Sequence, residues 1–210
     1  MKHIPLIFAL AFAVSLCNLS SKLKPRNSNA PGSGSNESSD SGGRVAERAE
    51  PTAAQQAALS GGQEIKWDPQ GMSWTVPAKW TQTSQESKML VWRSPGGSDA
   101  ASLDVNISTM DEKFPTEDSI KAYYDQAKSR AKNGEVDEVK WLEIDGVKGV
   151  EFREANPEKP DGFRRLQWMA YRKFAGQVQF VNVMLATDGK DFQRHQDAMY
   201  GILYSTKLVH

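Results

Sequence analysis

One histidine is the main candidate for acid–base chemistry in this sequence. His3 lies in an N-terminal apolar stretch and His210 is the final residue, which leaves His195. His195 recurs at helical spacing with Phe192 and Met199, where a histidine is more often a packing residue than a catalytic base. A serine hydrolase would also need an oxyanion hole, and no G-x-S-x-G motif is present. We therefore predict a protein that is not an enzyme, with a hydrolase using carboxylates or His195 as a minor alternative.

The acidic residues are numerous, but they do not follow the spacing of a metal site. Calcium binds carboxylate oxygens, yet the D-x-[DN]-x-[DN]-G pattern of a calcium loop is absent. Zinc needs three or four Cys, His or carboxylate ligands, and beyond Cys17 the sequence has no cysteine. Solvated loops and helix starts account for the acidic clusters, which are Asp111-Glu112, Glu117-Asp118, and Glu151 with Glu154, Glu158 and Asp161. The sequence predicts no metal and no cofactor.

One segment interleaves basic and aromatic residues, which are the usual anchors of binding surfaces. Strand alternation over residues 163–173 puts Arg164, Trp168 and Arg172 on one face, and Trp67 is a separate aromatic candidate. These four residues form our candidate interaction surface. The alternative is that the segment has one packed face and one ordinary solvated face, with Trp67 as a lid on the edge of the core.

The N-terminus is typical of an export signal. Lys2 precedes an apolar run over residues 4–16, which has the length of a signal-peptide core and falls short of the ~20 residues that span a bilayer. Cys17 closes this run and resembles the lipidated cysteine of bacterial lipoproteins, but Leu16 departs from the small residue usual before it. Lipidation and simple cleavage nearby both stay open. We predict a signal peptide over residues 1–17 and an exported protein of the periplasm or cell envelope, with Cys17 as the one candidate membrane anchor.

Residues 18–62 are predicted to form a disordered linker. The stretch 27–43 is rich in Ser, Gly and Asn and cannot bury enough apolar surface to offset its conformational entropy. Residues 49–59 contain an Ala and Gln run that could form a short helix. Its apolar side has only alanines and Leu59, so we expect that helix to be marginal.

Turn signals divide residues 63–210, the expected folded domain, into strands and helices. Asp145-Gly146 and Ala175-Gly176 predict hairpins, and the alternation over 102–109 predicts a strand with one buried and one wet face. Strands are expected at 72–76, 88–94, 102–109, 139–144, 147–154, 163–174 and 177–186, and helices from Thr116 to about 132 and from Asp188 onward. This order predicts an α+β fold, in which helices pack on an antiparallel sheet of about six to seven strands.

Three features of this order stand out: Trp74-Thr75-Val76-Pro77 followed by Lys79-Trp80, the hairpin Ile144-Asp145-Gly146, and a final amphipathic helix that ends near Tyr204-Ser205. Together they resemble the PsbP-like family, which includes the photosystem II accessory protein, Mog-type Ran-binding proteins and bacterial secreted or lipid-anchored domains. The likeness covers residues 65–210 in element order. It implies an α/β/α sandwich with a non-enzymatic binding or accessory role, and it carries over no catalytic residue.

Charge and composition narrow the expected partners. The 26 basic residues balance the 26 acidic ones, which argues against a nucleic acid as partner. We expect a monomeric accessory domain that binds a protein or another component of the cell envelope. A carrier of a small ligand or lipid is the alternative, and an apolar cavity beneath the terminal helix would be its sign.

Overall fold

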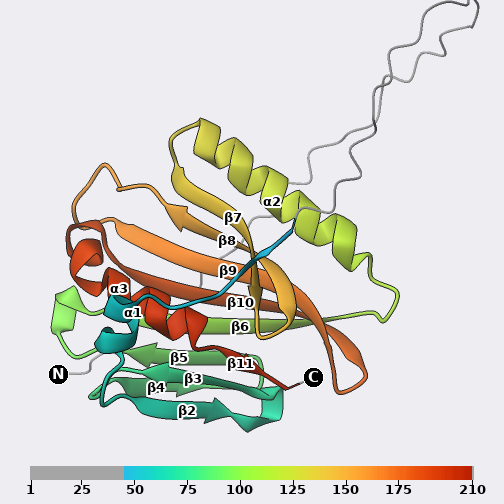
Figure 1. Ribbon diagram of the computed structural model, residues 1–210, viewed down its shortest axis with the longest axis horizontal. Helices are drawn as coiled ribbons and strands as arrows, with labels where there is room; N and C mark the ends of the chain where they lie inside the picture. Colours follow the sequence, from blue (N-terminus) through green and yellow to red (C-terminus); the bar gives the residue numbers. More distant parts are fainter. Residues whose placement is uncertain (1–44, 210) are drawn as a thin grey trace, which may run out of the picture. The chain divides into compact units, whose positions relative to one another are not determined.

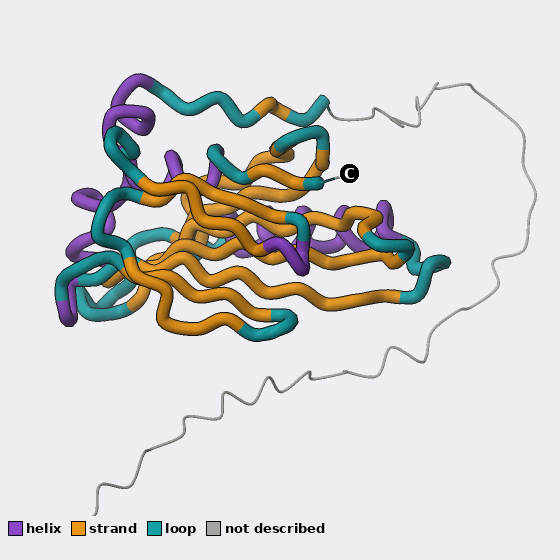
Figure 2. The backbone as a smooth tube through the Cα atoms, turned by 90° about the horizontal axis from the view of Figure 1, so that it is seen from below, coloured by secondary structure: helices purple, strands orange, loops and turns teal. Residues whose placement is uncertain are grey.

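The computed structural model describes residues 45–209, in which strands are more abundant than helices (Figure 2). The predicted signal peptide, the lipidation candidate Cys17, the linker up to residue 44 and His210 lie outside the described residues. Among the described helices, none has the length and apolar character needed to cross a membrane.

The larger sheet has eight strands in the order β1-β7-β8-β9-β10-β6-β5-β4. All neighbours in it pair antiparallel except β1, which runs parallel to β7. Its strands are β1 (Glu47–Arg48), β4 (Thr81–Gln85), β5 (Met89–Arg93), β6 (Ser102–Met110), β7 (Val136–Ile144), β8 (Val147–Glu154), β9 (Phe163–Phe174) and β10 (Gln177–Asp188). The predicted antiparallel sheet is confirmed, with β1 and β4 as strands that the sequence did not predict.

A smaller sheet joins segments from both ends of the described chain. It consists of β2 (Gln63–Trp67), β3 (Met72–Val76) and β11 (Lys207–Leu208), in the order β11-β3-β2. The strand expected at 72–76 therefore exists but belongs to this sheet. Its alternating side chains Met72, Trp74 and Val76 are buried, which is why the alternation predicted the strand correctly and could not assign it to a sheet.

Helices lie on both faces of the larger sheet, so the predicted α+β sandwich is confirmed. They are α1 (Ala53–Ala58), α2 (Thr116–Lys132) and α3 (Phe192–Tyr204). α2 packs on β7, β8 and β9 from one side, whereas α3 packs on β9, β10 and β3 from the other (Figure 1). α2 covers the residues expected for it, with Pro115 at the N-cap position, Asn133 as the C-cap and Gly134 in the left-handed conformation just beyond.

The main core lies between the larger sheet, α3 and the smaller sheet. Trp67, Trp74, Trp168, Phe192 and Met199 are all at most 1% exposed there. Trp67 alternates with Ile65 on β2 and points inward, so the prediction of an exposed aromatic was wrong and the lid reading is nearer the truth. A second cluster lies beneath α2 and contains Ile120, Tyr124, Ala127, Val136, Val150, Phe152 and Met169.

Both predicted hairpin turns are confirmed. Asp145 and Gly146 have φ values of 48° and 81°, and Ala175 and Gly176 have 50° and 75°. Positive φ at both central residues is the signature of the type I′ turns that suit the twist of paired strands. These turns set the registers of β7 with β8 and of β9 with β10.

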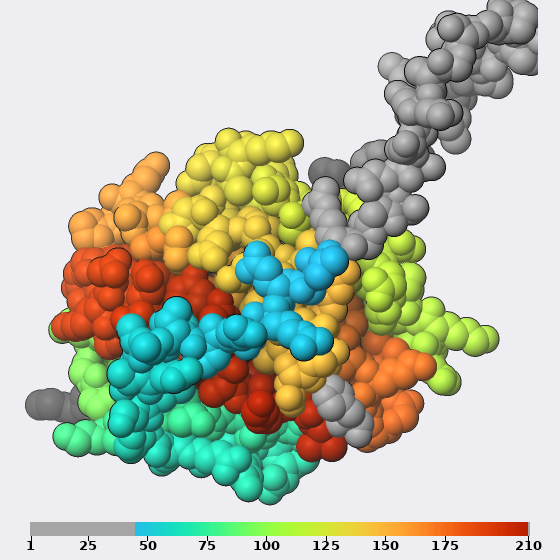
Figure 3. All heavy atoms as spheres, viewed as in Figure 1, coloured from blue at the N-terminus to red at the C-terminus, as the bar shows by residue number. Residues whose placement is uncertain are grey.

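The folded unit begins earlier in the chain than the sequence predicted. Residues 47–62, assigned to the linker, contain β1 and α1, and the backbone N–H of Ala49 donates to Glu143 O at 3.0 Å. A capping box between Thr52 and Gln55 starts α1, and α1 packs on α3. Figure 3 shows this N-terminal arm, residues 45–59 in blue to cyan, lying across the red and yellow parts of the surface.

Gly149 allows β8 to pass close to β9, and its replacement tests the packing of the main core. A Cβ there would lie 2.5 Å from Met169 O and 2.6 Å from Trp168 Nε1. We expect Gly149→Ala to lower the free energy of unfolding by about 1–3 kcal/mol, because the backbone must shift to accept the methyl group. Gly134→Asn is the control, since space is open there and asparagine tolerates φ near 78°. Urea denaturation measures the unfolding free energy of both variants. Equal losses in the two variants would contradict the close approach of β8 to β9 at Gly149.

Candidate functional site

The basic and aromatic residues predicted to form an interaction surface are buried. Arg164, Trp168 and Arg172 lie on the inner face of β9, at 8%, 0% and 6% exposure. The prediction that they form an exposed surface was wrong, and the packed-face alternative describes them. Trp168 Nε1 donates to Leu142 O at 3.2 Å, which satisfies the one polar atom of a side chain that fills the core.

Arg164 fastens one end of β9. Its Nε donates to Glu154 O at 2.8 Å, and its Nη2 pairs with Asp137 at 2.5 Å. The guanidinium also lies over the ring of Phe192, 4.1 Å from the centroid. A buried guanidinium with these partners is a structural clamp between β7, β8 and α3.

Arg172 fastens the other end of β9 to the smaller sheet. It donates to the backbone oxygens of Gln70, Gly71 and Val209 and to Gln179 Oε1. Desolvation lowers the pKa of Arg172 to about 10, so the guanidinium stays charged at neutral pH. This side chain therefore holds together the turn before β3, the segment after β11 and β9.

His195 lies on α3 and contacts a backbone atom. Its Nε2 is 3.0 Å from the backbone oxygen of Asp99. The ring is half-buried, and this contact links the start of α3 to the loop before β6. A catalytic base would instead be oriented by a carboxylate toward a nucleophile.

Glu151 on β8 is a buried carboxyl group, although the sequence placed it in a solvated cluster. Its side chain is fully buried, 3.2 Å from Lys140 Nζ on β7. Burial raises its pKa to about 7, with Lys140 acting against the rise and Glu138 adding to it. The Asp145-Gly146 turn predicts this pairing, because it places residue 140 opposite residue 151. The burial follows from α3 and the N-terminal arm, which the turn could not predict.

Two tyrosines of α3 close over this charge pair. Tyr204 Oη accepts from Lys140 Nζ at 3.1 Å, and Tyr200 Oη donates to Glu138 at 2.8 Å and accepts from Arg153 at 3.0 Å. Burial, with Glu151 nearby, raises the pKa of both tyrosines above the ordinary value, so they stay protonated. The network connects α3 to β7 and β8 and serves packing.

The remaining acidic residues do not converge. Glu154 pairs with Arg130 at 3.2 Å and with Arg165 at 3.1 Å. Within residues 45–209 no group of three His, Cys, Asp or Glu side chains is placed to hold a metal ion. The space beneath α3, where a carrier would need a cavity, holds the side chains of Trp168, Phe192 and Met199.

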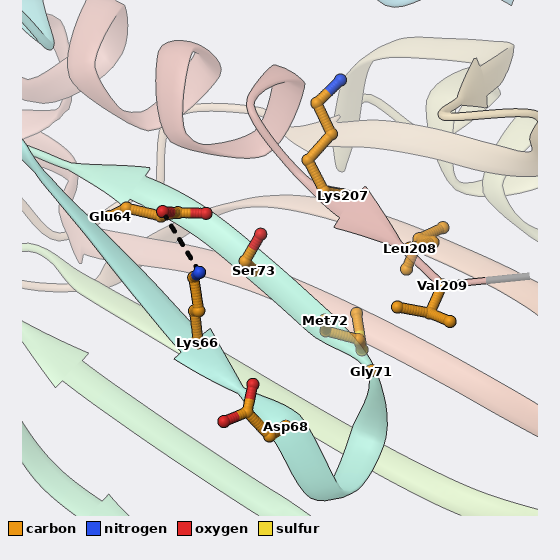
Figure 4. A pocket seen from close by; sticks show the side chains of 9 residues that line it. All are labelled: Glu64, Lys66, Asp68, Gly71, Met72, Ser73, Lys207, Leu208 and Val209. Carbon is orange, nitrogen blue, oxygen red and sulfur yellow. Dashed lines mark ion pairs between the residues drawn. The ribbon is translucent and has the colours of Figure 1, made fainter.

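A shallow groove runs along the outer face of the smaller sheet (Figure 4), with a volume of about 330 Å³. Lys66, Ser73 and Lys207 are neighbours across its three strands. Both lysines already face carboxylates, since Lys66 Nζ is 3.6 Å from Glu64 and Lys207 Nζ is 3.6 Å from Asp145. The groove is thus open and charge-balanced, unlike the apolar pockets that hold small ligands.

A second candidate surface is the face of β10, β6 and β5 on the same side of the larger sheet as α2. α2 reaches as far as β10, where Tyr123 stacks on Phe180 with centroids 5.3 Å apart. Among the elements that the structure describes, no helix or sheet packs on this face of β6, β5 and β4. We call it the open sheet face and define it by Met89, Val91, Arg93, Asp104, Asn106, Arg165, Gln167, Asn182 and Met184.

The open sheet face combines apolar and polar columns. Met89 and Val91 are half-buried on β5 and Met184 on β10, while Asp104 and Asn106 of β6 lie between them in register. The sequence predicted the wet face of β6 from its alternation, and that prediction is confirmed. The surface itself was missed, because the pairing of β6 with β5 and β10 cannot be found from local spacing.

Comparisons with known proteins identify the fold and go no further. No family model and no curated protein sequence matches the chain. The match to the structure of LpqN from Mycobacterium tuberculosis covers 71% of this chain and 86% of the LpqN chain, at 10% sequence identity and a TM-score of 0.53. The match to the structure of CyanoP, the PsbP of the cyanobacterium Synechocystis, covers 70% of this chain and 92% of the CyanoP chain, at 13% sequence identity and a TM-score of 0.44.

A third match is a protein of Bacteroides thetaiotaomicron, at 9% identity and a TM-score of 0.44. The match covers 71% of this chain and 49% of that protein, so this chain spans about half its length. PsbP and Mog1 structures are among the matches, which confirms the predicted PsbP-like resemblance. At these identities, the likeness is one of fold.

Glu151 should make stability depend on pH. Its folded pKa of about 7 exceeds the ordinary 4.5, so the native state keeps a proton that the unfolded chain has lost between these values. Its contribution is therefore complete below pH 4.5 and is lost as the pH rises through 7, by up to about 3 kcal/mol. In the wild type, the unfolding free energy should decrease between pH 5 and pH 8. In Glu151→Gln most of this decrease should be absent, as measured by urea denaturation. Glu86→Gln, which changes an exposed carboxylate, should show the same decrease as the wild type. Equal dependence of the unfolding free energy on pH in all three proteins would refute the assignment of the decrease to Glu151.

Proposed function

We propose that this protein is an exported, non-catalytic binding domain of the cell envelope, and that its partner is another protein. The observation that carries the proposal is the open sheet face. Half-buried methionine and valine side chains, amides and arginines stand together there without cover from the described elements. Methionine, arginine and aromatic residues are enriched in protein interfaces, and charged residues are depleted at their centres.

The reactive side chains in the described part of the chain support a binding role over catalysis. His195 contacts a backbone oxygen, and Glu151 is sealed beneath α3 beside Lys140. Arg164 and Arg172 hold strands and carbonyl groups in place. A catalytic site needs a nucleophile, a base and a charge-stabilising group that converge on one accessible point. These residues are separated and engaged in packing.

The envelope location rests on the N-terminal sequence. The apolar run over residues 4–16 has the length of a signal core, and Cys17 is a candidate for lipidation. The LpqN structure, which shares the fold, is of a protein involved in cell envelope biogenesis. That likeness is one of fold, and it agrees with the proposed location.

The proposed export can be tested by intact mass and cell fractionation, with Cys17→Ala beside the wild type. We expect the chain in the envelope or periplasmic fraction without residues 1–16, and a diacyl or triacyl mass increase that Cys17→Ala abolishes. A soluble exported chain that has lost its leader and carries no added mass would remove the lipid anchor but keep the location. A full-length chain in the cytoplasm would contradict the proposal.

A further inference from the structure

We propose that the open sheet face binds an amphipathic α-helix of a partner protein, laid beside α2 and carrying acidic residues at the end that meets Arg93 and Arg165. This inference rests on the proposed function and names the surface and the kind of partner. It follows from the width of the uncovered strands, the pattern of side chains on them and the distribution of charge.

The dimensions fit one further helix. Neighbouring strands lie about 4.8 Å apart, so β10, β6, β5 and β4 span roughly 14 to 19 Å. A helix with its side chains is about 10 to 12 Å across. α2 already covers β7, β8 and β9 of the same face, and Tyr123 and Phe180 form its flank. A second helix parallel to that flank would complete the layer.

The side-chain columns match the apolar stripe of such a helix. Met89 and Val91 of β5 form one apolar column, and the column of β10 consists of Met184, the amide of Asn182, and Phe180 beneath Tyr123 of α2. The two columns are separated by β6 and so lie about 10 Å apart, the width of a helix. Methionine side chains adapt to the shape of a partner, which suits a docking surface.

Asp104 and Asn106 of β6 form a polar column between β5 and β10, opposite the middle of the partner helix's apolar stripe. Asn106 of β6 is paired in register with Asn182 of β10, whose Oδ1 accepts from Gln167 Nε2 at 2.7 Å. These amides offer hydrogen bonds that an all-apolar stripe would leave unmade. The expected partner helix therefore has at least one Ser, Thr, Asn or Gln within its apolar stripe.

The charges define the expected orientation. Arg93 is exposed on β5, and the carboxylate that it attracts among the described residues is Asp104 on β6. Arg165 lies across the sheet on β9 at the same level, joined through Ser102 and Ala186, and is partly neutralised by Glu154. Asp104 is the one carboxylate between them, and Ser102 Oγ donates to it at 2.6 Å. The arginine end thus favours acidic residues on the partner.

A photo-crosslinking residue at position Met184 of the full chain, in its native cell, tests the proposal directly. The same residue at Ser73 in the groove of Figure 4 and at Lys128 on the outer side of α2 provides two comparison positions. We expect one discrete protein at Met184, joined through a segment with an apolar stripe at helical spacing, an acidic end and a polar residue in the stripe. Far-UV circular dichroism and the melting temperature confirm that each variant is folded.

A charge reversal supplies a second, independent readout. Arg93→Glu should lower the crosslinking yield at Met184 at least tenfold, while Lys128→Glu should leave it unchanged. Equal yields in both variants would overturn the assigned orientation and with it the acidic partner helix.

The crosslinked species decides between this surface and the broader function. Capture of a second copy of this chain, of its own residues 1–44, of a lipid, or of a segment without an apolar stripe would overturn the helix proposal. Crosslinks at Ser73 or Lys128 alone would overturn it too, while the protein would remain a binding domain. An absence of crosslinks at all three positions, with folded variants, would refute both the helix proposal and the proposed binding function.

Discussion

The inward row of β9 is the constraint on which the other layers depend. Five alternating residues, from Arg164 to Arg172, are buried between the larger sheet and the elements that cover it. Trp168 fills the centre, and the two arginines at the ends reach β7, α3, the turn before β3 and the segment after β11. An arginine buried on an inner face is tolerated only when its donors find acceptors, so these contacts specify one arrangement of the covering elements.

That constraint separates the two faces of the larger sheet. The inner face is committed to the core, because inward apolar residues of β9, β10 and β6 belong to the same cluster as those of α3 and the smaller sheet. The outer face is only half used, since a single helix of 17 residues lies over β7 to β9. Substitutions on the open sheet face can thus be made without disturbing the core, as expected of a fold that supports different functions.

Local patterns predicted the elements, and long-range packing decided their roles. The alternation in 102–109 and the Asp145-Gly146 turn depend on a few neighbouring residues, and both were predicted correctly. β4 has the sequence TQTSQ, without any apolar residue to signal a strand, and forms because β5 offers an edge. Arg164 and Arg172 appeared to be surface anchors, since a buried guanidinium becomes recognisable only when its distant acceptors are known.

The same reasoning explains what could be predicted of the candidate site. The register of β7 with β8 makes Lys140 and Glu151 neighbours, so the turn alone predicts their pairing. Whether the pair faces water or the core depends on Tyr200 and Tyr204, which are about 50 residues further along the chain. The open sheet face is set by strand order, in which β10 lies beside β6, and no spacing within either strand specifies it.

The smaller sheet also has a kinetic consequence. Its strands β3 and β11 come from opposite ends of the folded unit, and the N–H of Val209 donates to Gly71 O at 2.9 Å. Thr75 N likewise donates to Ser205 Oγ at 2.9 Å. Closing such long loops costs entropy before any contact offsets it, so folding dominated by distant pairings takes milliseconds to seconds. Because β11 pairs with β3 and Ser205 contacts Thr75, the edge of the main core beside Trp74 is completed only when residues 205–209 are in place.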